Sequence, residues 1–421
     1  MRVTAFCICL GLAIPSAAAV LEEEQRAGPA PAVSDTSTEW RNDGANLDAV
    51  RLINEAYAKT PFSREFEGVL DQPPLRITWQ IGPNVPVAWK GGVAGLIGDD
   101  ICLAGGLWMP SRANLAYAFN LPTQTYRELP PPPVSTEYTQ GACDGSYVYL
   151  VGGRGAGRTV YRLGRSGEDA WQYEELPLLP EAEGAGRWVA SVALVPGQWL
   201  FLVGGHPTGT PTETRDAPAL PDYRLRLDVA GANWELMAPY PGGPRALMIA
   251  GTARGKLYVF GGSHPEPTMR KNHLELAKKY GLTAPWGGVP NYRDAYQYEP
   301  GANSWKPIRS APFPVVSGCA VALQDRYILL MGSTDVRTLR VGKTTGRQDP
   351  FWTGYGDRIL CYDVEQDNYS NVGVMPYGVA TAPWVACGDT LYGFGGEPAH
   401  SYNANTENVL QIGTIEWLVS K

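Results

Sequence analysis

The chain has 421 residues, a formal net charge of −7 at pH 7 and 44% hydrophobic residues. This hydrophobic content excludes a chain that is disordered throughout. The acidic balance, without a long basic run, argues against a nucleic-acid partner. No stretch after the first twenty residues is apolar enough to span a bilayer, so we expect no membrane span.

The first 19 residues have the features of a secretory signal peptide. Arg2 precedes an apolar run from Val3 to Ile14, and Ala17-Ala18-Ala19 is placed for cleavage. A transmembrane anchor would need roughly 20 continuous apolar residues, and this run is shorter. We therefore expect a periplasmic or secreted protein, with residues 1–19 removed.

Residues 20–70 predict a flexible leader, because they begin rich in Glu, Ala, Pro and Ser. One short helix is expected within it, where apolar residues recur at helical spacing at Leu47, Val50, Ile53 and Tyr57. The folded domain is expected over residues 71–421.

Five cysteines remain after removal of the signal peptide, which is an odd number. They show no C-x-x-C spacing and stand in apolar, strand-like runs. We expect buried free thiols rather than a disulfide framework. The five are Cys102, Cys143, Cys319, Cys361 and Cys387.

An apolar run that ends in one or two glycines occurs six times. The first glycine of each run stands at position 105, 152, 204, 261, 332 or 395. Intervals of this size suit one four-stranded blade per repeat, lengthened by insertions.

A pair of apolar or aromatic residues follows each run, seven positions apart in five of the six repeats. This spacing lets the chain go up one strand, turn and return, so the two side chains are expected to meet across a hairpin. The pairs are Phe119 and Tyr126, Leu227 and Trp234, Tyr298 and Trp305, Tyr362 and Tyr369, and Leu410 and Trp417, with Tyr161 and Trp171 as a looser sixth pair.

Together these signals predict an all-β fold, a six-bladed β-propeller that resembles the kelch-repeat family. Small-residue strands such as 246–250 and 315–322 are expected innermost, because the inner strands crowd around a narrow channel. Residues 76–79 are expected as an extra outer strand that seals the ring against the last blade.

The connections after the glycines are expected to share one rim with the links into the inner strands, because neighbouring strands are antiparallel. The longest connections start at His206, Ser263 and Ser333, so this rim is where binding or catalysis is expected. Good helix formers over Thr268–Tyr280 predict a helix that could cover it. The polar residues predicted here are Arg154, Arg158, Arg187, His206, Arg245, His264, Arg270, Arg337, Arg347, Glu397 and His400.

Several of these residues have a structural alternative. Arg187 and Arg245 start inner strands, where a role between blades is an equal alternative to ligand contact. Glu397 directly follows a glycine pair and could serve only to bond local amides. The histidines lack the spacing of metal ligands, so no metal and no cofactor is expected. The glycine-rich run 152–157 enters no helix, which argues against nucleotide binding.

Within kelch proteins, three segments carry a closer resemblance. Tyr240–Arg245, Leu257–Gly262 and Tyr298–Trp305 look like the first blades of the bacterial N-acetylneuraminate epimerase family. Pro376-Tyr377-Gly378 and the run ending in Glu397 are similar to the segment with that family's proposed catalytic glutamate. The order of blades is then rotated, as in cyclically permuted mutarotases.

One departure concerns the arginine that this family carries six positions after the glutamate, where this chain has Asn403. An arginine for the substrate carboxylate would then come from elsewhere, for instance Arg270, Arg337 or Arg347.

The resemblance implies a sugar mutarotase that acts on an acidic sugar such as N-acetylneuraminate. Glu397 is expected as base or acid, His400 or Tyr377 as its counterpart, and an arginine as the anchor of the substrate anion. Two alternatives stay open. One is a propeller without chemistry that binds a glycan or a protein through the same rim. The other is a copper oxidase of the kelch type, although four histidines give no readable ligand set.

Overall fold

A computed structural model describes residues 72–109, 114–167, 170–180, 186–207, 220–263, 292–312, 315–332, 358–397 and 408–419. All of them belong to one of the two units into which the chain divides, Asp43–Lys421. The predicted helices around Leu47–Tyr57 and over Thr268–Tyr280 lie outside these ranges. No helix within these ranges is long and apolar enough to cross a bilayer.

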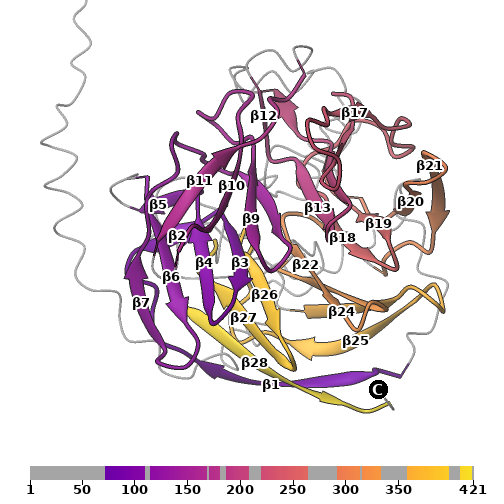
Figure 1. The fold of residues 1–421 in the computed structure, drawn as a ribbon. Helices are drawn as coiled ribbons and strands as arrows, with labels where there is room; N and C mark the ends of the chain where they lie inside the picture. Colours follow the sequence, from indigo (N-terminus) through magenta and orange to yellow (C-terminus); the bar gives the residue numbers. More distant parts are fainter. Residues whose placement is uncertain are drawn as a thin grey trace, which may run out of the picture. The chain divides into compact units, whose positions relative to one another are not determined.

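Six four-stranded antiparallel sheets confirm the predicted propeller, and Figure 1 shows them in chain order around a common centre. Blade 1 contains β3 (Val93–Ile97), β4 (Asp100–Ala104), β6 (Ala116–Asn120) and β7 (Thr125–Glu128). Blade 2 contains β8 (Gln140–Cys143), β9 (Tyr147–Val151), β10 (Val160–Arg165) and β11 (Trp171–Glu175). Blade 3 contains β13 (Ser191–Val195), β14 (Trp199–Val203), β16 (Tyr223–Arg226) and β17 (Glu235–Leu236).

The second half of the ring repeats this arrangement. Blade 4 contains β18 (Ile249–Ala253), β19 (Lys256–Phe260), β20 (Ala295–Glu299) and β21 (Ser304–Ile308). Blade 5 contains β22 (Cys319–Leu323), β23 (Tyr327–Met331), β24 (Arg358–Asp363) and β25 (Asn368–Val374). Blade 6 contains β26 (Trp384–Cys387), β27 (Thr390–Phe394), β28 (Leu410–Trp417) and, as its outer strand, β1 (Leu75–Ile81).

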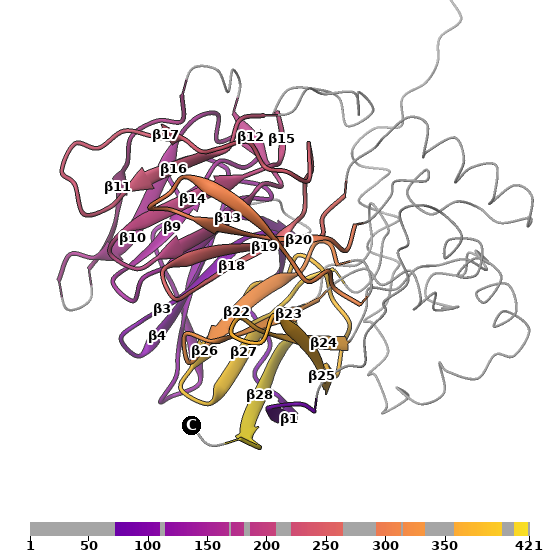
Figure 2. The ribbon, with the colours of Figure 1, turned by 90° about the vertical axis from the view of Figure 1, so that its right-hand side faces the viewer.

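The ring is closed by β1, as residues 76–79 predict. β1 pairs antiparallel with β28 from Leu75 opposite Trp417 to Ile81 opposite Gln411. Figure 2 shows the two strands side by side, the indigo β1 next to the yellow β28. The last blade is therefore assembled from two distant segments of the chain.

The predicted cross-strand pairs form in three blades. Phe119 and Tyr126, Tyr298 and Trp305, and Tyr362 and Tyr369 are opposite each other, with ring centroids 4.9, 4.9 and 5.0 Å apart.

Two of the other pairs do not form. Tyr161 lies opposite Glu175 instead of Trp171, because the longer hairpin shifts the register. Leu410 and Trp417 stand on the single strand β28, because the strand that completes this blade is β1.

The glycine pairs are needed where neighbouring blades touch. A Cβ at Gly152 would lie 2.4 Å from the carbonyl oxygen of Arg187 in the next blade, and φ of Gly152 is +62°. The next residue, Gly153, donates its N–H to that same oxygen at 2.8 Å. The same N–H to carbonyl contact joins Gly205 to Arg245 at 2.7 Å, and Gly396 to Trp89 at 2.8 Å. The repeated glycines therefore let each blade approach the backbone of its neighbour.

The inner strands start later than expected. β18 begins at Ile249 rather than at 246, and β22 begins at Cys319 rather than at 315. Before each of them one residue has left-handed backbone geometry, Leu247 with φ 58° and Ser317 with φ 60°. Such a residue breaks the extended conformation, so the segment before it belongs to the rim and not to the strand.

Candidate functional site

At the rim where the inner strands start, every blade has an equivalent three-residue segment, here called the rim triplet. The six triplets are residues 89–91, 136–138, 187–189, 245–247, 315–317 and 379–381. Its last residue has a positive φ in all six blades, at Gly91, Tyr138, Val189, Leu247, Ser317 and Thr381. Four N–H to carbonyl bonds link five successive members, for example Thr381 to Ser317 at 2.7 Å and Gly91 to Thr381 at 2.9 Å.

The middle residue of the triplet pairs with the residue that follows the glycines. The two short ribbons of the structure, β2 (Ala88–Lys90) with β5 (Leu107–Met109) and β12 (Arg187–Trp188) with β15 (His206–Pro207), contain this pairing in blades 1 and 3. Single bridges provide it in blades 2, 4 and 6, as Glu137 with Arg154, Ala246 with Ser263, and Ala380 with Glu397. The structure thus supports the expectation that post-glycine residues share one rim with the links into the inner strands.

Glu397 is held at this rim by two residues from other blades. Lys90 places its Nζ 2.6 Å from Glu397 Oε1, and the Tyr138 hydroxyl donates to the same oxygen at 2.7 Å. The backbone of Glu397 exchanges two hydrogen bonds with Ala380, at 2.8 and 2.9 Å. The carboxylate of blade 6 therefore lies between an ammonium from blade 1 and a phenol from blade 2.

The Lys90–Glu397 ion pair is buried, with side chains 10% and 9% exposed. Removing two charges from water costs several kcal/mol per ion, and a buried pair often gives no net stability over apolar residues. The corresponding positions of blade 4 hold Ala246 and Ser263, so the fold does not require charges there. A carboxylate, an ammonium and a phenol that touch at one oxygen suit proton transfer.

Glu397, Lys90 and Tyr138 are here called the Glu397 cluster. Aromatic and cationic side chains extend this cluster over blades 2 and 3. The Tyr138 ring lies edge-on to Trp188, with centroids 6.1 Å apart, and Trp188 lies 6.2 Å from the ring of His206. The Arg154 guanidinium lies over Trp188, with Cζ 4.4 Å from the ring centroid. Three of the predicted residues, Glu397, Arg154 and His206, are thus connected through Tyr138 and Trp188.

Arg187 and Arg245 are bound within their own blades. Arg187 is 1% exposed and donates to the carbonyl oxygens of Gly204 and Pro221, at 2.8 and 2.5 Å. Arg245 is 5% exposed and binds both carboxylate oxygens of Asp294, at 2.5 and 2.8 Å. These contacts give both arginines a structural role, and a role toward a ligand stays a prediction.

Tyr377 precedes the blade 6 rim triplet and packs against the core shared by blades 5 and 6. Its N–H donates to Gln411 Oε1 at 3.0 Å, and its carbonyl oxygen accepts from Gln411 Nε2 at 3.3 Å. The remaining predicted residues, His264, Arg270, Arg337, Arg347 and His400, lie outside the described residues.

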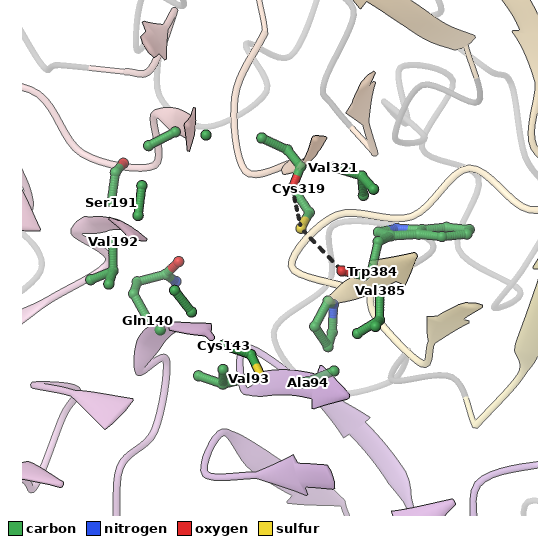
Figure 3. Close-up of a pocket in the computed structure, with 18 of the residues that line it drawn as sticks. Val93, Ala94, Gln140, Cys143, Ser191, Val192, Cys319, Val321, Trp384 and Val385 are labelled. Atoms are coloured by element: carbon green, nitrogen blue, oxygen red, sulfur yellow. Dashed lines mark hydrogen bonds between the residues drawn. The ribbon is translucent and has the colours of Figure 1, made fainter. Parts of the chain in front are cut away.

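A central cavity of about 460 Å³ begins at this rim and runs between the six inner strands. Thr381 lines this cavity and directly follows Ala380, which forms the β-bridge with Glu397. Ser317 lines the cavity as well. Figure 3 shows the wall of this cavity, where Cys143 and Cys319 project from different blades. The Cys319 thiol donates a hydrogen bond to the carbonyl oxygen of Trp384. The Glu397 cluster therefore lies beside the mouth of a channel.

The five cysteines of the propeller are free thiols, as expected. Burial raises the pKa of Cys143 and that of Cys319 to about 11. Over the described ranges, no three His, Cys, Asp or Glu side chains come together as a metal site.

Sequence reasoning missed Lys90, Tyr138 and Trp188. The glycine runs align the strands but leave out the links between blades, where all three residues stand. Aligning the residues just before each inner strand would have placed Lys90, Glu137 and Trp188 at one repeated position.

The comparison with known proteins agrees with the predicted resemblance. No protein-family model matches the chain. It is 26% identical over 217 residues to N-acetylneuraminate epimerase of Yersinia pestis (strain Pestoides F), an alignment that covers 46% of this chain and 51% of the relative. It is 28% identical over 195 residues to N-acetylneuraminate epimerase of Haemophilus influenzae (strain 86-028NP), covering 42% and 47%. The chain spans about half the length of the curated relatives it matches, and with its six blades it resembles a kelch-type propeller of that kind.

Proposed function

We propose that the protein is a sugar mutarotase that acts at the Glu397 cluster, with an acidic sugar such as N-acetylneuraminate as substrate. The observation that carries this proposal is the contact of Lys90 and Tyr138 with one buried oxygen of Glu397. The similarity to proteins named N-acetylneuraminate epimerase supports the substrate class.

The chemistry requires only paired proton transfers. Glu397 removes the proton of the anomeric hydroxyl, while an acid gives a proton to the ring oxygen, and the bond between the anomeric carbon and the ring oxygen breaks. Rotation of the freed carbonyl group and the reverse transfers close the other anomer. Among the described residues, Tyr138 and Lys90 are two acids in contact with Glu397.

The test follows one pure anomer of N-acetylneuraminate by NMR. We expect the protein to shorten the equilibration time at catalytic concentration, and to act weakly on a neutral hexose. Equilibration at the spontaneous rate for every sugar tried, together with saturable sugar binding, would favour a binding propeller without chemistry.

We also propose that the protein is exported. Support comes from the charged start, the apolar run and the small residues before position 20. Expression in a Gram-negative host followed by N-terminal sequencing of the periplasmic fraction tests this, and an uncleaved chain in the cytoplasm contradicts it.

A further inference from the structure

We infer that Arg154 and Trp188 form a subsite for the carboxylate of the substrate. The inference rests on the proposed function for the identity of the sugar, but the anion site itself follows from the contacts of these two side chains. The sequence predicted Arg154 at this rim, and it named Arg270, Arg337 and Arg347 as examples of arginines that could hold the carboxylate.

The Arg154 guanidinium can be reached by a ligand. Its side chain is 48% exposed, whereas that of Arg245 is 4% exposed and holds Asp294 with both of its terminal nitrogens. Glu137 Oε2 is 3.9 Å from Arg154 Nη1, which is beyond hydrogen-bond distance. Arg154 can therefore offer donors to an incoming anion.

Trp188 holds the Arg154 guanidinium in place. The Cζ of Arg154 lies over the Trp188 ring, 4.4 Å from the centroid, and this cation–π contact holds the guanidinium at the ring face. A planar guanidinium with fixed donors is suited to bind a carboxylate through two parallel hydrogen bonds. The backbone of Arg154 is also fixed, because it exchanges hydrogen bonds with Glu137 at 2.6 and 3.1 Å.

Tyr138 connects the subsite to Glu397. Tyr138 contacts both sides, since its hydroxyl binds Glu397 and its ring lies edge-on to Trp188. In N-acetylneuraminate the carboxylate is bonded directly to the anomeric carbon, so a carboxylate held by Arg154 on the side of Tyr138 turns the anomeric hydroxyl toward Glu397. The Arg154 donors are separate from the Lys90–Glu397 ion pair, so binding of the carboxylate does not require that this pair be broken.

Glu137 sets the specificity of this subsite. Its carboxylate, on a side chain 20% exposed, repels a second negative charge unless that charge takes up the Arg154 donors directly. We therefore expect one carboxylate in a defined orientation to be accepted, and a diffuse or doubly charged anion such as inorganic phosphate to bind more weakly.

The experiment measures binding of N-acetylneuraminate and of its methyl ester, which has lost the charge, by isothermal titration calorimetry on the full chain. In wild type we expect the acid to bind at least about tenfold more tightly than the ester, as a charge-assisted hydrogen-bonded pair allows. Arg154→Gln should remove this preference with little effect on the ester, and Arg154→Lys should restore part of it.

The matched control is Arg226→Gln. Arg226 is also stacked on a tryptophan, 4.9 Å from the Trp199 ring centroid, and its side chain is 36% exposed, but it lies at the other end of blade 3, away from the rim. The acid-to-ester preference should be unchanged in this variant. Loss of the preference in Arg226→Gln as well would show a general charge effect and overturn the subsite.

The subsite and the proposed function can fail separately. Equal preference in wild type and Arg154→Gln, or no preference in wild type, overturns the subsite even if anomers are interconverted. An Arg154-dependent preference without any faster equilibration of anomers supports the subsite and contradicts the mutarotase.

Discussion

The rim of blades 1 to 3 and the rim of blades 4 and 5 share one backbone design and differ in chemistry. The middle residue of the rim triplet is Lys90, Glu137 or Trp188 in the first group, and Ala246 or Val316 in the second. Left-handed geometry follows this position in both groups. The difference teaches that the repeat fixes where a side chain stands, while function depends on which side chain occupies the position.

The largest expected effect comes from removing the Glu397 carboxylate, which blade 6 presents to Lys90 and Tyr138 of the first group. Glu397→Gln should slow anomer interconversion by about 10²- to 10⁴-fold, the usual contribution of a general acid–base group. Ser263→Ala, at the same post-glycine position in blade 4, should leave the rate unchanged. NMR exchange rates check both variants, and equal loss in both would remove the distinction between the two parts of the rim.

The next effect concerns stability. Lys90→Met leaves the Glu397 carboxylate buried without its ammonium, and breaking such a pair costs about 3–5 kcal/mol. Urea unfolding of Lys90→Met, Glu397→Gln and the double variant gives the coupling between them. We expect the double variant to recover most of the loss, as the uncharged position of blade 4 suggests. A double variant as unstable as Lys90→Met would argue against electrostatic pairing.

A third experiment tests whether the backbone design is really shared. Gly152→Ala in blade 2 and Gly261→Ala in blade 4 should each cost at least about 2 kcal/mol, because both have positive φ and face a carbonyl oxygen, at 2.4 and 2.1 Å. Gly197→Ala is the control, since φ is +66° and nothing lies within 4 Å, so only about 1 kcal/mol of backbone strain is expected. Clearly different losses for Gly152 and Gly261 would mean that the two junctions are not equivalent.

The dependence of stability on pH compares the channel wall in blades 2 and 5. The pKa values of Cys143 in blade 2 and Cys319 in blade 5 are both raised to about 11 by burial. Above the ordinary thiol value of about 8.5, the unfolded chain releases these protons and the folded chain keeps them. Stability should therefore fall as pH rises from about 9 to 11, by at most about 1.4 kcal/mol per pH unit for each thiol.

Single Cys143→Ala and Cys319→Ala variants measure this dependence by thermal unfolding at each pH. The two substitutions should reduce the slope equally, because burial raises both pKa values to about 11. A slope that neither substitution changes would mean that tyrosines or other groups dominate the alkaline loss.

Much of the fold could be predicted from the sequence, because the glycines and aromatic pairs report local geometry. The strands that end at Gly105, Gly152 and Gly204 follow directly from the runs, and the outer strand at residues 76–79 follows from its place before the first repeat. Register was less predictable. Tyr161 was matched to Trp171, but the actual hairpin puts Glu175 opposite it.

The candidate site could be predicted only in part. Glu397, Arg154 and His206 directly follow glycines, so their common rim could be inferred from strand direction alone. Their partners could not, because the hydrogen bond from Tyr138 to Glu397 joins residues 259 positions apart and depends on how blades 6 and 2 face each other across blade 1. Contacts of this kind arise from closure of the ring, which no local pattern describes.

Closure by β1 also bears on the order in which the protein can become active during synthesis. Lys90 follows β1 within ten residues, while Glu397 precedes β28, and these two strands pair to complete blade 6. A ribosome must release nearly all of the described sequence before Lys90 and Glu397 can meet. The buried ion pair between them therefore forms only in a chain whose two ends have been joined correctly.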